Sequence, residues 1–327
     1  MNTVPPDKNL WSGRSSSAQQ PNEYWHECIA FGTVSALSTH TIDDALPKIG
    51  LLGYACDEGV KRNNGRIGTA QAPDAIRQQL GRLAAHFDPG TVMDFGDVPC
   101  VNGALEETQK TFAQRVAALQ AKGILSVGMG GGHDLAYAHF KGIRQGLQNG
   151  ASPKIGILNF DAHFDLRPTV NGPTSGTPFY QLMTEYSAAV PYYVVGLQSQ
   201  ATPQSLFDQA QAFGVGYSPI EACTIDQAQK VTAELLAFFA DCDGLYITID
   251  LDGFAAAHAP GVSAPGPFGF SPEFFNAVFT SLLQSQKLVA LDVVELNPKY
   301  DHDQNTARLA AQIINLGVVI ACKQLSS

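Results

Sequence analysis

Residues 154–165 have the sequence KIGILNFDAHFD, in which an apolar run is followed at once by two carboxylates and an imidazole. The run 154–160 is almost continuous in apolar residues, as is typical of a strand that helices cover on both faces. Asp161, His163 and Asp165 follow at two-residue spacing, which directs side chains in an extended chain toward one face. We therefore predict a buried strand whose carboxyl end carries a polar cluster.

A second acidic cluster and one further histidine occur at the ends of other apolar runs. Asp250 and Asp252 close the run 245–250, and His133 lies in the glycine-rich segment 128–134, GMGGGHD. The glycines would let the backbone turn tightly beside a cluster, because glycine tolerates conformations that other residues avoid. Carboxylates crowded together in a protein interior are costly unless positive charge compensates them. Divalent cations are the compensation that this pattern indicates.

The donor set indicates two metal ions rather than one. Six side chains are candidate ligands: His133, Asp161, His163, Asp165, Asp250 and Asp252. They exceed what one tetrahedral zinc ion takes, and one nitrogen with several carboxylate oxygens per ion favours Mn²⁺ over zinc or copper. Two ions about 3.5–4 Å apart can hold a bridging hydroxide, so the pattern indicates metal-assisted hydrolysis. Any one of these aspartates alone could instead be an ordinary turn or capping residue.

Short apolar runs alternate with amphipathic stretches along the chain. The predicted strands are 49–55, 92–95, 124–128, 154–160, 192–196, 245–250 and 288–294. The predicted helices include 72–85, 106–121, 134–147, 227–240, 272–283 and 306–323. This alternation is typical of an α/β fold, and we predict three α/β/α layers around a mainly parallel central sheet. His133, Asp161, Asp250 and Glu295 then all lie at the carboxyl ends of strands, where such sheets bind ligands.

Composition and charge narrow the class of protein. The chain has 327 residues, of which 45% are hydrophobic and 15% are charged, enough to form a large core. We predict a single catalytic domain over 26–327, preceded by a polar segment 1–25 that could be flexible. A net charge of −10 without a Lys/Arg run argues against nucleic acid as a partner. The sequence shows no signal peptide and no segment that approaches a membrane span, so we expect a cytoplasmic protein that acts on a small molecule.

Five motifs together resemble those of the ureohydrolase, or arginase-like, family. In chain order they are Gly130-Gly131-Gly132-His133-Asp134, Asp161-Ala162-His163-Phe164-Asp165, Ser175-Gly176-Thr177-Pro178-Phe179, Asp250-Leu251-Asp252 and Glu295-Leu296-Asn297-Pro298. The resemblance implies an arginase-like fold and a hydrolase that adds water to the C=N carbon of guanidino or amidino compounds. It also implies two Mn²⁺ per chain, bound in two sets: His133, Asp161, Asp165 and Asp250 for one ion, and Asp161, His163, Asp250 and Asp252 for the other. Family members commonly form trimers or hexamers, so a homo-oligomer is a further expectation.

The third motif is similar to that of the formimidoylglutamase branch of the family. Arginases and agmatinases usually have a histidine where this chain has Ser175, and Arg167 occupies a place where arginases have an asparagine. The resemblance implies that Arg167, Ser175 and Thr177 contact the substrate. It implies the conversion of N-formimidoyl-L-glutamate and water to L-glutamate and formamide, a step of histidine degradation. A guanidinium can hold a carboxylate in bidentate fashion, and this substrate carries two carboxylates.

Two residues are expected to take part in the chemistry. Asp165 would pass a proton to the departing glutamate nitrogen, and Glu295 would accept hydrogen bonds from the amidinium group. Alternatives remain open: Arg167 could pair with Asp165 or with a helix end, Glu295 could cap the next helix, and Ser175 could be a turn residue. The chain could also be an agmatinase or a guanidino-acid hydrolase of the same family, or a noncatalytic binding or assembly subunit. Lys61, Arg62 and Arg66, in a Gly/Asn-rich loop after the first predicted strand, could close over the substrate or merely be solvated, and His258, which follows Asp252 closely, has no assigned role.

Overall fold

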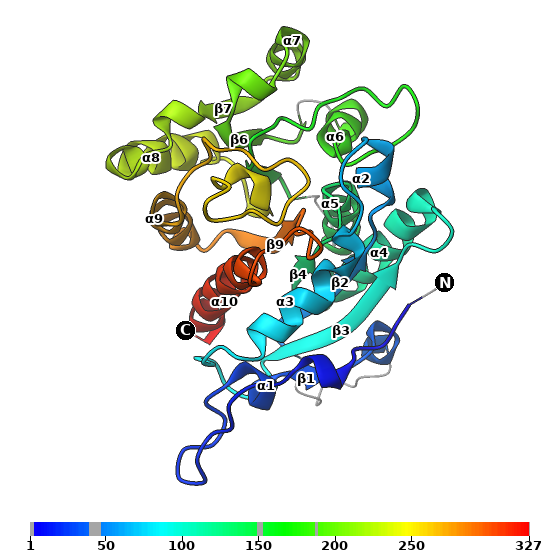
Figure 1. Cartoon of the computed structure of the whole chain (residues 1–327), viewed down its shortest axis with the longest axis vertical. Coiled ribbons are helices and arrows are strands. Elements are labelled where there is room, and N and C mark those ends of the chain that lie inside the picture. Colours follow the sequence, from blue (N-terminus) through cyan, green and yellow to red (C-terminus); the bar gives the residue numbers. More distant parts are fainter. Residues whose placement is uncertain (1–2, 39–46, 149–152, 187–188, 327) are drawn as a thin grey trace.

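The computed structural model describes residues 3–38, 47–148, 153–186 and 189–326, which build a nine-stranded sheet flanked by helices (Figure 1). The strands are β1 (Ala30–Phe31), β2 (Ile49–Ala55), β3 (Val92–Pro99), β4 (Leu125–Met129), β5 (Ile155–Phe160), β6 (Tyr192–Leu197), β7 (Gly216–Pro219), β8 (Gly244–Asp250) and β9 (Leu288–Val294). They are hydrogen-bonded in the order β1-β3-β2-β4-β9-β8-β5-β6-β7, and every neighbouring pair is parallel. The predicted three-layer arrangement with a mainly parallel sheet is confirmed.

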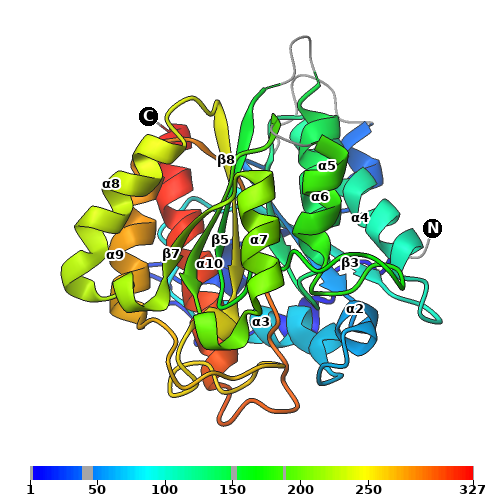
Figure 2. The ribbon, with the colours of Figure 1, turned by 90° about the horizontal axis from the view of Figure 1, so that it is seen from above.

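Helices cover both faces of this sheet. They are α1 (Trp25–Cys28), α2 (Glu58–Arg62), α3 (Ala72–Leu80), α4 (Leu105–Gln120), α5 (Leu135–Gly146), α6 (Pro178–Tyr186), α7 (Gln204–Phe213), α8 (Ala228–Phe238), α9 (Pro272–Leu283) and α10 (Asn305–Ser326). Figure 2 separates α8, α9 and α10 on one face of the sheet from α4, α5 and α6 on the other. Helix α3 packs against α10 in the first of these layers. Each layer encloses its own hydrophobic cluster against the sheet, which is why the central strands are apolar on both faces.

All seven predicted strands and six predicted helices form, with shifted ends. Helix α3 stops at Leu80, although the pattern predicted a helix over 72–85. Beyond it the backbone pairs with the N-terminal segment: Trp25 N donates to Leu83 O at 3.0 Å, and Ala85 N donates to Glu23 O at 2.8 Å. These tertiary bonds replace the helical ones that residues 83–85 would have made. The edge strands β1 and β7 and the helices α1, α2, α6 and α7 were not predicted, because they are short and carry weak periodicity.

The topology brings four strand ends together at the middle of the sheet. Strands β4, β9, β8 and β5 are consecutive neighbours, and the motifs that contain the candidate ligands begin where these strands end. Since all four strands run in the same direction, their carboxyl ends lie along one edge. Four polar segments that are far apart in the sequence therefore meet at one place.

Helix α10 is long and apolar enough, by length and composition alone, to cross a membrane. Its apolar residues, including Ala310, Ile314 and Val318, are instead buried in the core cluster beside α3 and α9. It is therefore a core helix of the α/β/α fold.

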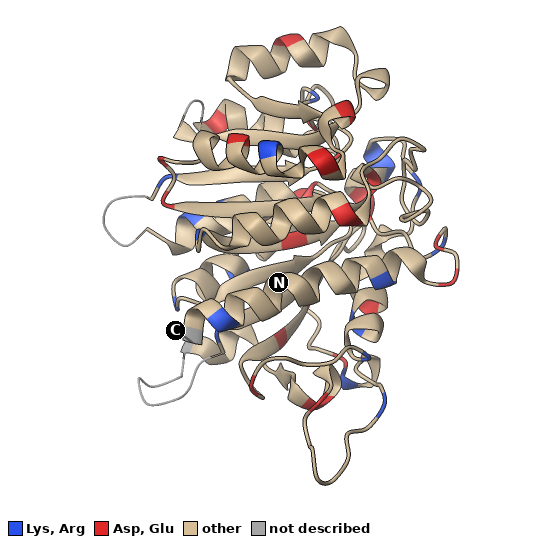
Figure 3. Cartoon of the chain, turned by 90° about the vertical axis from the view of Figure 1, so that its left-hand side faces the viewer, with Lys and Arg blue, Asp and Glu red and all other residues tan. Residues whose placement is uncertain are grey.

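Figure 3 shows the Lys and Arg positions on one side of the molecule scattered among Asp and Glu, in keeping with a chain of 30 acidic and 20 basic residues.

A buried ion cluster joins the N-terminal segment, α3 and β3. The Arg77 side chain is 1% exposed, and its guanidinium lies 2.8 Å from Asp94 Oδ2 and 2.7 Å from Asp97 Oδ1. Trp11 Nε1 donates to Asp94 Oδ2 at 3.0 Å, and the Trp11 ring stacks on Trp25. The described part of the segment before residue 26 thus contacts β3 directly. The predicted boundary between an N-terminal segment 1–25 and a catalytic domain 26–327 stays a prediction.

Removing the cation of this cluster should be strongly destabilising. Arg77→Ala would leave the Asp94 and Asp97 carboxylates buried without their partner, which typically costs about 3–5 kcal/mol. We expect that loss in the free energy of unfolding, measured by urea denaturation with circular dichroism. Arg82→Ala, at an exposed arginine two residues beyond α3, should change it by less than about 0.5 kcal/mol. Equal effects of the two substitutions would refute the stabilising role of the cluster.

Candidate metal centre

Six potential metal ligands and one further carboxylate converge at the carboxyl edge of the four central strands. Strand β4 leads to His133, β5 leads to Asp161, His163 and Asp165, β8 ends at Asp250 and leads to Asp252, and β9 leads to Glu295. Every member of the set is buried or only partly exposed. The structure therefore brings together all six residues that the sequence pattern predicted as metal ligands.

Glycines place His133 at this edge. Gly131 N donates to Tyr54 O at 2.8 Å, and Gly132 N donates to Cys56 O at 3.1 Å, so the loop after β4 lies flat against the end of β2. A Cβ on Gly131 would lie 1.8 Å from Cys56 O, a distance that no side chain can tolerate. The close approach of the two backbones thus requires glycine here, as the motif suggested.

The first cluster surrounds one nitrogen of His133. Its Nδ1 lies 3.2 Å from Asp161 Oδ2, 3.1 Å from Asp165 Oδ2 and 3.1 Å from Asp250 Oδ2. This nitrogen is buried and has no hydrogen-bond partner among the described groups, even though three carboxylate oxygens are so close. An imidazole nitrogen and three carboxylate oxygens around one point match the ligands of a divalent cation.

The second cluster shares Asp161 with the first. His163 Nδ1 lies 3.4 Å from Asp161 Oδ1 and 3.2 Å from Asp252 Oδ2. Asp161 presents Oδ2 to the first cluster and Oδ1 to the second, as a bridging ligand would. Asp250, the other expected bridge, belongs only to the first group, and its Oδ1 accepts a hydrogen bond from Asp252 N at 2.8 Å.

The electrostatics of the clusters also favour bound cations. Burial raises the pKa of Asp250 well above its ordinary value, and the charges of Asp252 and Asp161 raise it further. Burial lowers the pKa of His133, but the surrounding carboxylates outweigh that effect and raise it well above its ordinary value. Crowding of carboxylates in a protein interior is costly unless positive charge compensates it. Two divalent ions would supply the positive charge and leave all the ligands deprotonated.

Asp165 and Glu295 both have left-handed backbone conformations, with φ of 49° and 66°. Such conformations typically cost about 1–3 kcal/mol for residues other than glycine, and they are common at functional sites. Glu295 Oε1 accepts a hydrogen bond from His133 N at 2.9 Å, so this carboxylate also holds the loop that carries His133. Burial raises the pKa of Glu295 to about 8, and burial likewise raises the pKa of Asp165.

A cavity of about 270 Å³ opens beside the two clusters. It is lined by His163, Asp165, Asp250, Asp252 and Glu295, by the two predicted substrate contacts Arg167 and Ser175, and by Asn63, Asn64, Gly65, Phe164, Ala201, Thr202, Leu206, Ser263 and Ala264. Arg167 is exposed, and no ion pair joins its guanidinium to the part of the chain that the structure describes. The alternative in which Arg167 pairs with Asp165 is therefore not what the structure shows.

The other two predicted substrate contacts differ in their surroundings. Ser175 is 6% exposed, and its Oγ accepts a hydrogen bond from Asn63 Nδ2 at 3.3 Å at the cavity wall. Thr177 is 2% exposed and does not line the cavity. Its hydroxyl donates to Thr174 O at 3.0 Å and lies 3.1 Å from Gln181 Oε1, so it stabilises the turn that precedes α6.

The sequence pattern missed Asn63 and Asn64, because it drew attention to the charged residues around them. Those charged side chains have other partners: Lys61 pairs with Glu58 at 3.3 Å, Arg62 pairs with Glu58 and Glu106, and Arg66 lies over the Tyr300 ring. His258 does not line the cavity either. The Asn-Asn-Gly turn signal at 63–65 was the feature that could have identified this wall of the cavity.

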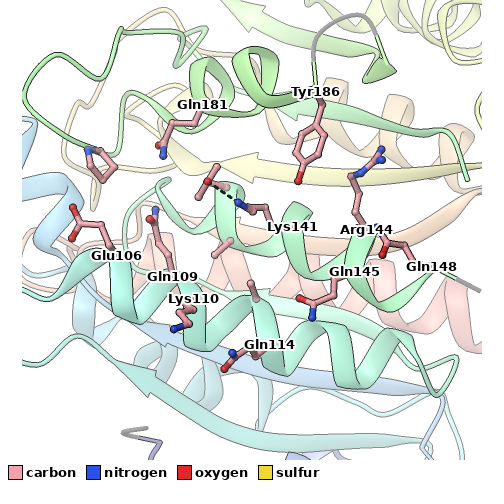
Figure 4. Close-up of a pocket in the computed structure, with 14 residues that line it drawn as sticks. Glu106, Gln109, Lys110, Gln114, Lys141, Arg144, Gln145, Gln148, Gln181 and Tyr186 are labelled. Atoms are coloured by element: carbon pink, nitrogen blue, oxygen red, sulfur yellow. Dashed lines mark hydrogen bonds between the residues drawn. The ribbon is translucent and has the colours of Figure 1, made fainter. Parts of the chain in front are cut away.

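A second hollow, of about 650 Å³, lies between α4, α5 and α6 on the outer surface (Figure 4). Its lining is rich in glutamine and includes Lys141, whose ammonium group is 3.1 Å from Glu185 Oε2 and is therefore compensated. None of the candidate metal ligands lines it. The smaller cavity is the candidate site, because it alone of these two combines the clusters with a route to solvent.

Comparisons with known proteins agree with this geometry. A model of the arginase family matches residues 47–317. A formimidoylglutamase of Geobacillus kaustophilus is 37% identical over 309 residues, which cover 94% of each chain. A formimidoylglutamase of Nocardia farcinica is 40% identical over 305 residues, which cover 93% of this chain and 94% of the relative. The solved structure of Trypanosoma cruzi formiminoglutamase with a Mn²⁺ pair has a TM-score of 0.74 at 22% identity, covering 89% of this chain and 98% of that one.

The sharing of Asp161 between the clusters can be tested by metal analysis. Asp161→Ala removes an oxygen from both sets and should abolish binding of both ions, whereas Asp252→Ala removes an oxygen from the second set only and should leave one ion. We expect zero and one bound ion per chain after incubation with MnCl₂ and gel filtration, measured by inductively coupled plasma mass spectrometry. Two ions bound to the Asp161→Ala protein would contradict a bridging role.

Proposed function

The chain belongs to the arginase family, and from that premise we propose that it hydrolyses N-formimidoyl-L-glutamate to L-glutamate and formamide. One observation carries the proposal: the cavity joins two clusters of candidate metal ligands to an exposed arginine, Arg167, that has no ion pair among the described residues. The clusters suit hydrolysis of a C=N bond, and the arginine suits an acidic substrate. The relatives named formimidoylglutamase support the same activity, since they align over almost the whole chain.

We propose that the six ligands hold two Mn²⁺ per chain. His133, Asp161, Asp165 and Asp250 would hold one ion, and Asp161, His163 and Asp252 would hold the other, with Asp250 a candidate to join this second set. The predominance of oxygen over nitrogen among these ligands favours Mn²⁺ over zinc. When bound, the two ions would make water nucleophilic at neutral pH and favour its attack on the C=N carbon.

Arg167 would bind a carboxylate of the substrate. It lies in the segment after the β5 motif, where its backbone N donates to Gly176 O at 3.0 Å and so ties it to the Ser175 motif. Its guanidinium lines the cavity without a competing carboxylate partner in the described chain. A bidentate guanidinium pair would fix the glutamate portion and bring the formimidoyl group toward the clusters.

Glu295 and Asp165 would act on the reacting group itself. Glu295 uses Oε1 to hold His133 N, so Oε2 is the oxygen that can accept a hydrogen bond from the amidine nitrogens. Asp165 belongs to the first cluster and also lines the cavity, where its carboxylate can accept the proton that the attacking water loses. It would then return that proton to the glutamate nitrogen as the C–N bond breaks, which leaves formamide and glutamate.

Ser175 would help to shape the substrate side of the cavity, and Thr177 would act through the turn that it stabilises. With serine in place of a shuttling histidine, proton transfer falls to Asp165 in this proposal. We further propose that the protein works in the cytoplasm and that it assembles as a trimer or hexamer, as the family resemblance implied.

A substrate panel tests the proposed function directly. With MnCl₂ present, the protein should release formamide and glutamate from N-formimidoyl-L-glutamate, and it should release little or no urea from L-arginine, agmatine or 4-guanidinobutyrate. Products can be followed by proton nuclear magnetic resonance. Preferential urea release would instead identify a guanidino hydrolase, and an inert protein that still binds two ions would point to a noncatalytic family member.

The role of Arg167 can be separated from that of the metal centre. Charge-assisted hydrogen bonds contribute roughly 1.5–3 kcal/mol, and a lysine would recover only part of that, so Arg167→Lys should lower kcat/KM for N-formimidoyl-L-glutamate about tenfold or more. Hydrolysis of formamidine, which has no carboxylate, should be unaffected. Arg308→Lys, at an exposed position on α10, serves as the matched control. Equal losses on both substrates would mean that Arg167 supports the clusters rather than the carboxylate.

A further inference from the structure

A chain of buried side chains runs from His133 into the core on the α4 and α5 side of the sheet. His133 Nε2 lies 3.1 Å from Thr248 Oγ1, and Thr248 Oγ1 donates to Asp292 Oδ1 at 2.5 Å. On its other oxygen, Asp292 Oδ2 contacts His139 Nδ1 at 2.6 Å and accepts a hydrogen bond from Tyr246. Each of these five residues is at most 1% exposed, so the chain is closed to solvent. The proposed chemistry uses only its first member.

The sheet is built to accommodate this chain. In the parallel ladder Asp292 of β9 is paired with Thr248 of β8 on one side and with Gly128 of β4 on the other. A Cβ on Gly128 would lie 2.8 Å from Asp292 Cβ and 3.3 Å from His139 Nδ1. The glycine therefore leaves the space that the carboxylate and the second imidazole occupy.

The protons of this chain have one consistent arrangement. Gln120 Nε2 donates to Ser126 Oγ at 3.1 Å, and the acceptor that the described residues offer to the Ser126 hydroxyl is His139 Nε2, at 2.8 Å. His139 then accepts at Nε2 and donates from Nδ1 to Asp292. The Asp292 carboxylate thus receives donors from three directions, His139, Tyr246 and Thr248. Several hydrogen bonds of this kind offset the cost of burying a carboxylate away from water.

This arrangement determines the tautomer of His133. A hydroxyl has one proton, and Thr248 gives it to Asp292, so Thr248 Oγ1 can only accept from His133 Nε2. The neutral imidazole then carries its proton on Nε2 and presents a bare Nδ1 to the oxygens of Asp161, Asp165 and Asp250. That is the form in which imidazole binds a metal ion.

We propose that Asp292, acting through Thr248, is a positioning residue that holds His133 in its metal-binding tautomer and orientation. The proposal rests on the metal site in the proposed function and adds two residues that lie outside its ligand set. Neither residue touches the substrate cavity. Their effect should therefore appear in the binding of the ion held by His133, and not in the contacts to substrate.

Mn²⁺ binding to the chelator-treated protein tests the proposal without reference to turnover. The wild type should bind two ions per chain when titrated with MnCl₂, with free Mn²⁺ measured by electron paramagnetic resonance. Thr248→Val keeps the shape of the side chain but removes its hydroxyl. It should weaken the binding of one Mn²⁺ about 10- to 100-fold and leave the affinity for the other unchanged. Thr248→Ser restores a hydroxyl on the same carbon and should restore the affinity.

Two further variants make the result specific. Thr111→Val makes the same change at a buried threonine of α4, whose hydroxyl donates to Glu107 O at 2.9 Å, and it should leave both ions tightly bound. Asp292→Asn can present an N–H to Thr248, reverse the hydroxyl and favour the wrong His133 tautomer, so it should weaken the same ion as Thr248→Val. Thermal unfolding of each metal-free variant identifies losses that come from misfolding.

The outcomes separate the two proposals. Wild-type affinity for both ions in Thr248→Val would overturn the role of Thr248 and Asp292 and leave the proposed function standing. Weakening in Thr248→Val that Thr248→Ser does not reverse would also overturn it, because packing rather than the hydroxyl would then be responsible. A wild-type protein that binds no Mn²⁺ would overturn the proposed function itself, and this inference with it.

Discussion

The crowding of four aspartates at one edge of the sheet is the constraint on which the rest of the structure depends. These residues are Asp161, Asp165, Asp250 and Asp252. They lie so close together that each negative charge raises the free energy of ionising its neighbours, and burial raises it further. Such a group is tolerable only where strand ends, backbone donors and imidazoles are brought to it from several directions. The four neighbouring parallel strands β4, β9, β8 and β5 supply these groups. The strain at Asp165 and Glu295 is a local cost of the same convergence.

The sequence was sufficient to predict the layers, the strand directions and the polar residues that gather at one edge of the sheet, because each leaves a local signal. Strands covered on both faces must be apolar throughout, and their polar ends stand out, as at Phe160-Asp161 and Ile249-Asp250. The glycines before His133 were informative for a similar reason, since the backbone at Gly131 approaches β2 too closely for any side chain. These features depend on chemistry within a few residues of each motif.

What the sequence could not predict depends on contacts between distant segments. The end of α3 at Leu80 is decided by backbone bonds from residues 83 and 85 to the N-terminal segment. Asn63 becomes part of the cavity wall through its contact with Ser175, which is far away in the sequence. Thr177 lies outside the cavity because its hydroxyl bonds within the turn at Thr174, and the motif alone does not predict this bond. Asp292 was predicted only as a strand residue, because nothing in its neighbourhood in the sequence indicates His139, Tyr246 or Thr248 as partners.

The two halves of the metal centre differ in how firmly the protein holds them. His133 is 1% exposed and is held at its backbone N by Glu295, at Nε2 by Thr248, and by the glycine loop before it. The His163 side chain is 28% exposed and lines the cavity with Asp252. An ion in the first set would therefore be enclosed on the side of His133 and reach the cavity only on the side of Asp165 and Asp250, whereas an ion in the second set would lie beside the more exposed His163. This asymmetry follows from the fold, because His133 is buried at the ends of the central strands whereas the loop after β5, which carries His163, forms part of the cavity wall. A substrate anchored at Arg167, two residues beyond Asp165, would approach from the open side and leave the enclosed ligands undisturbed.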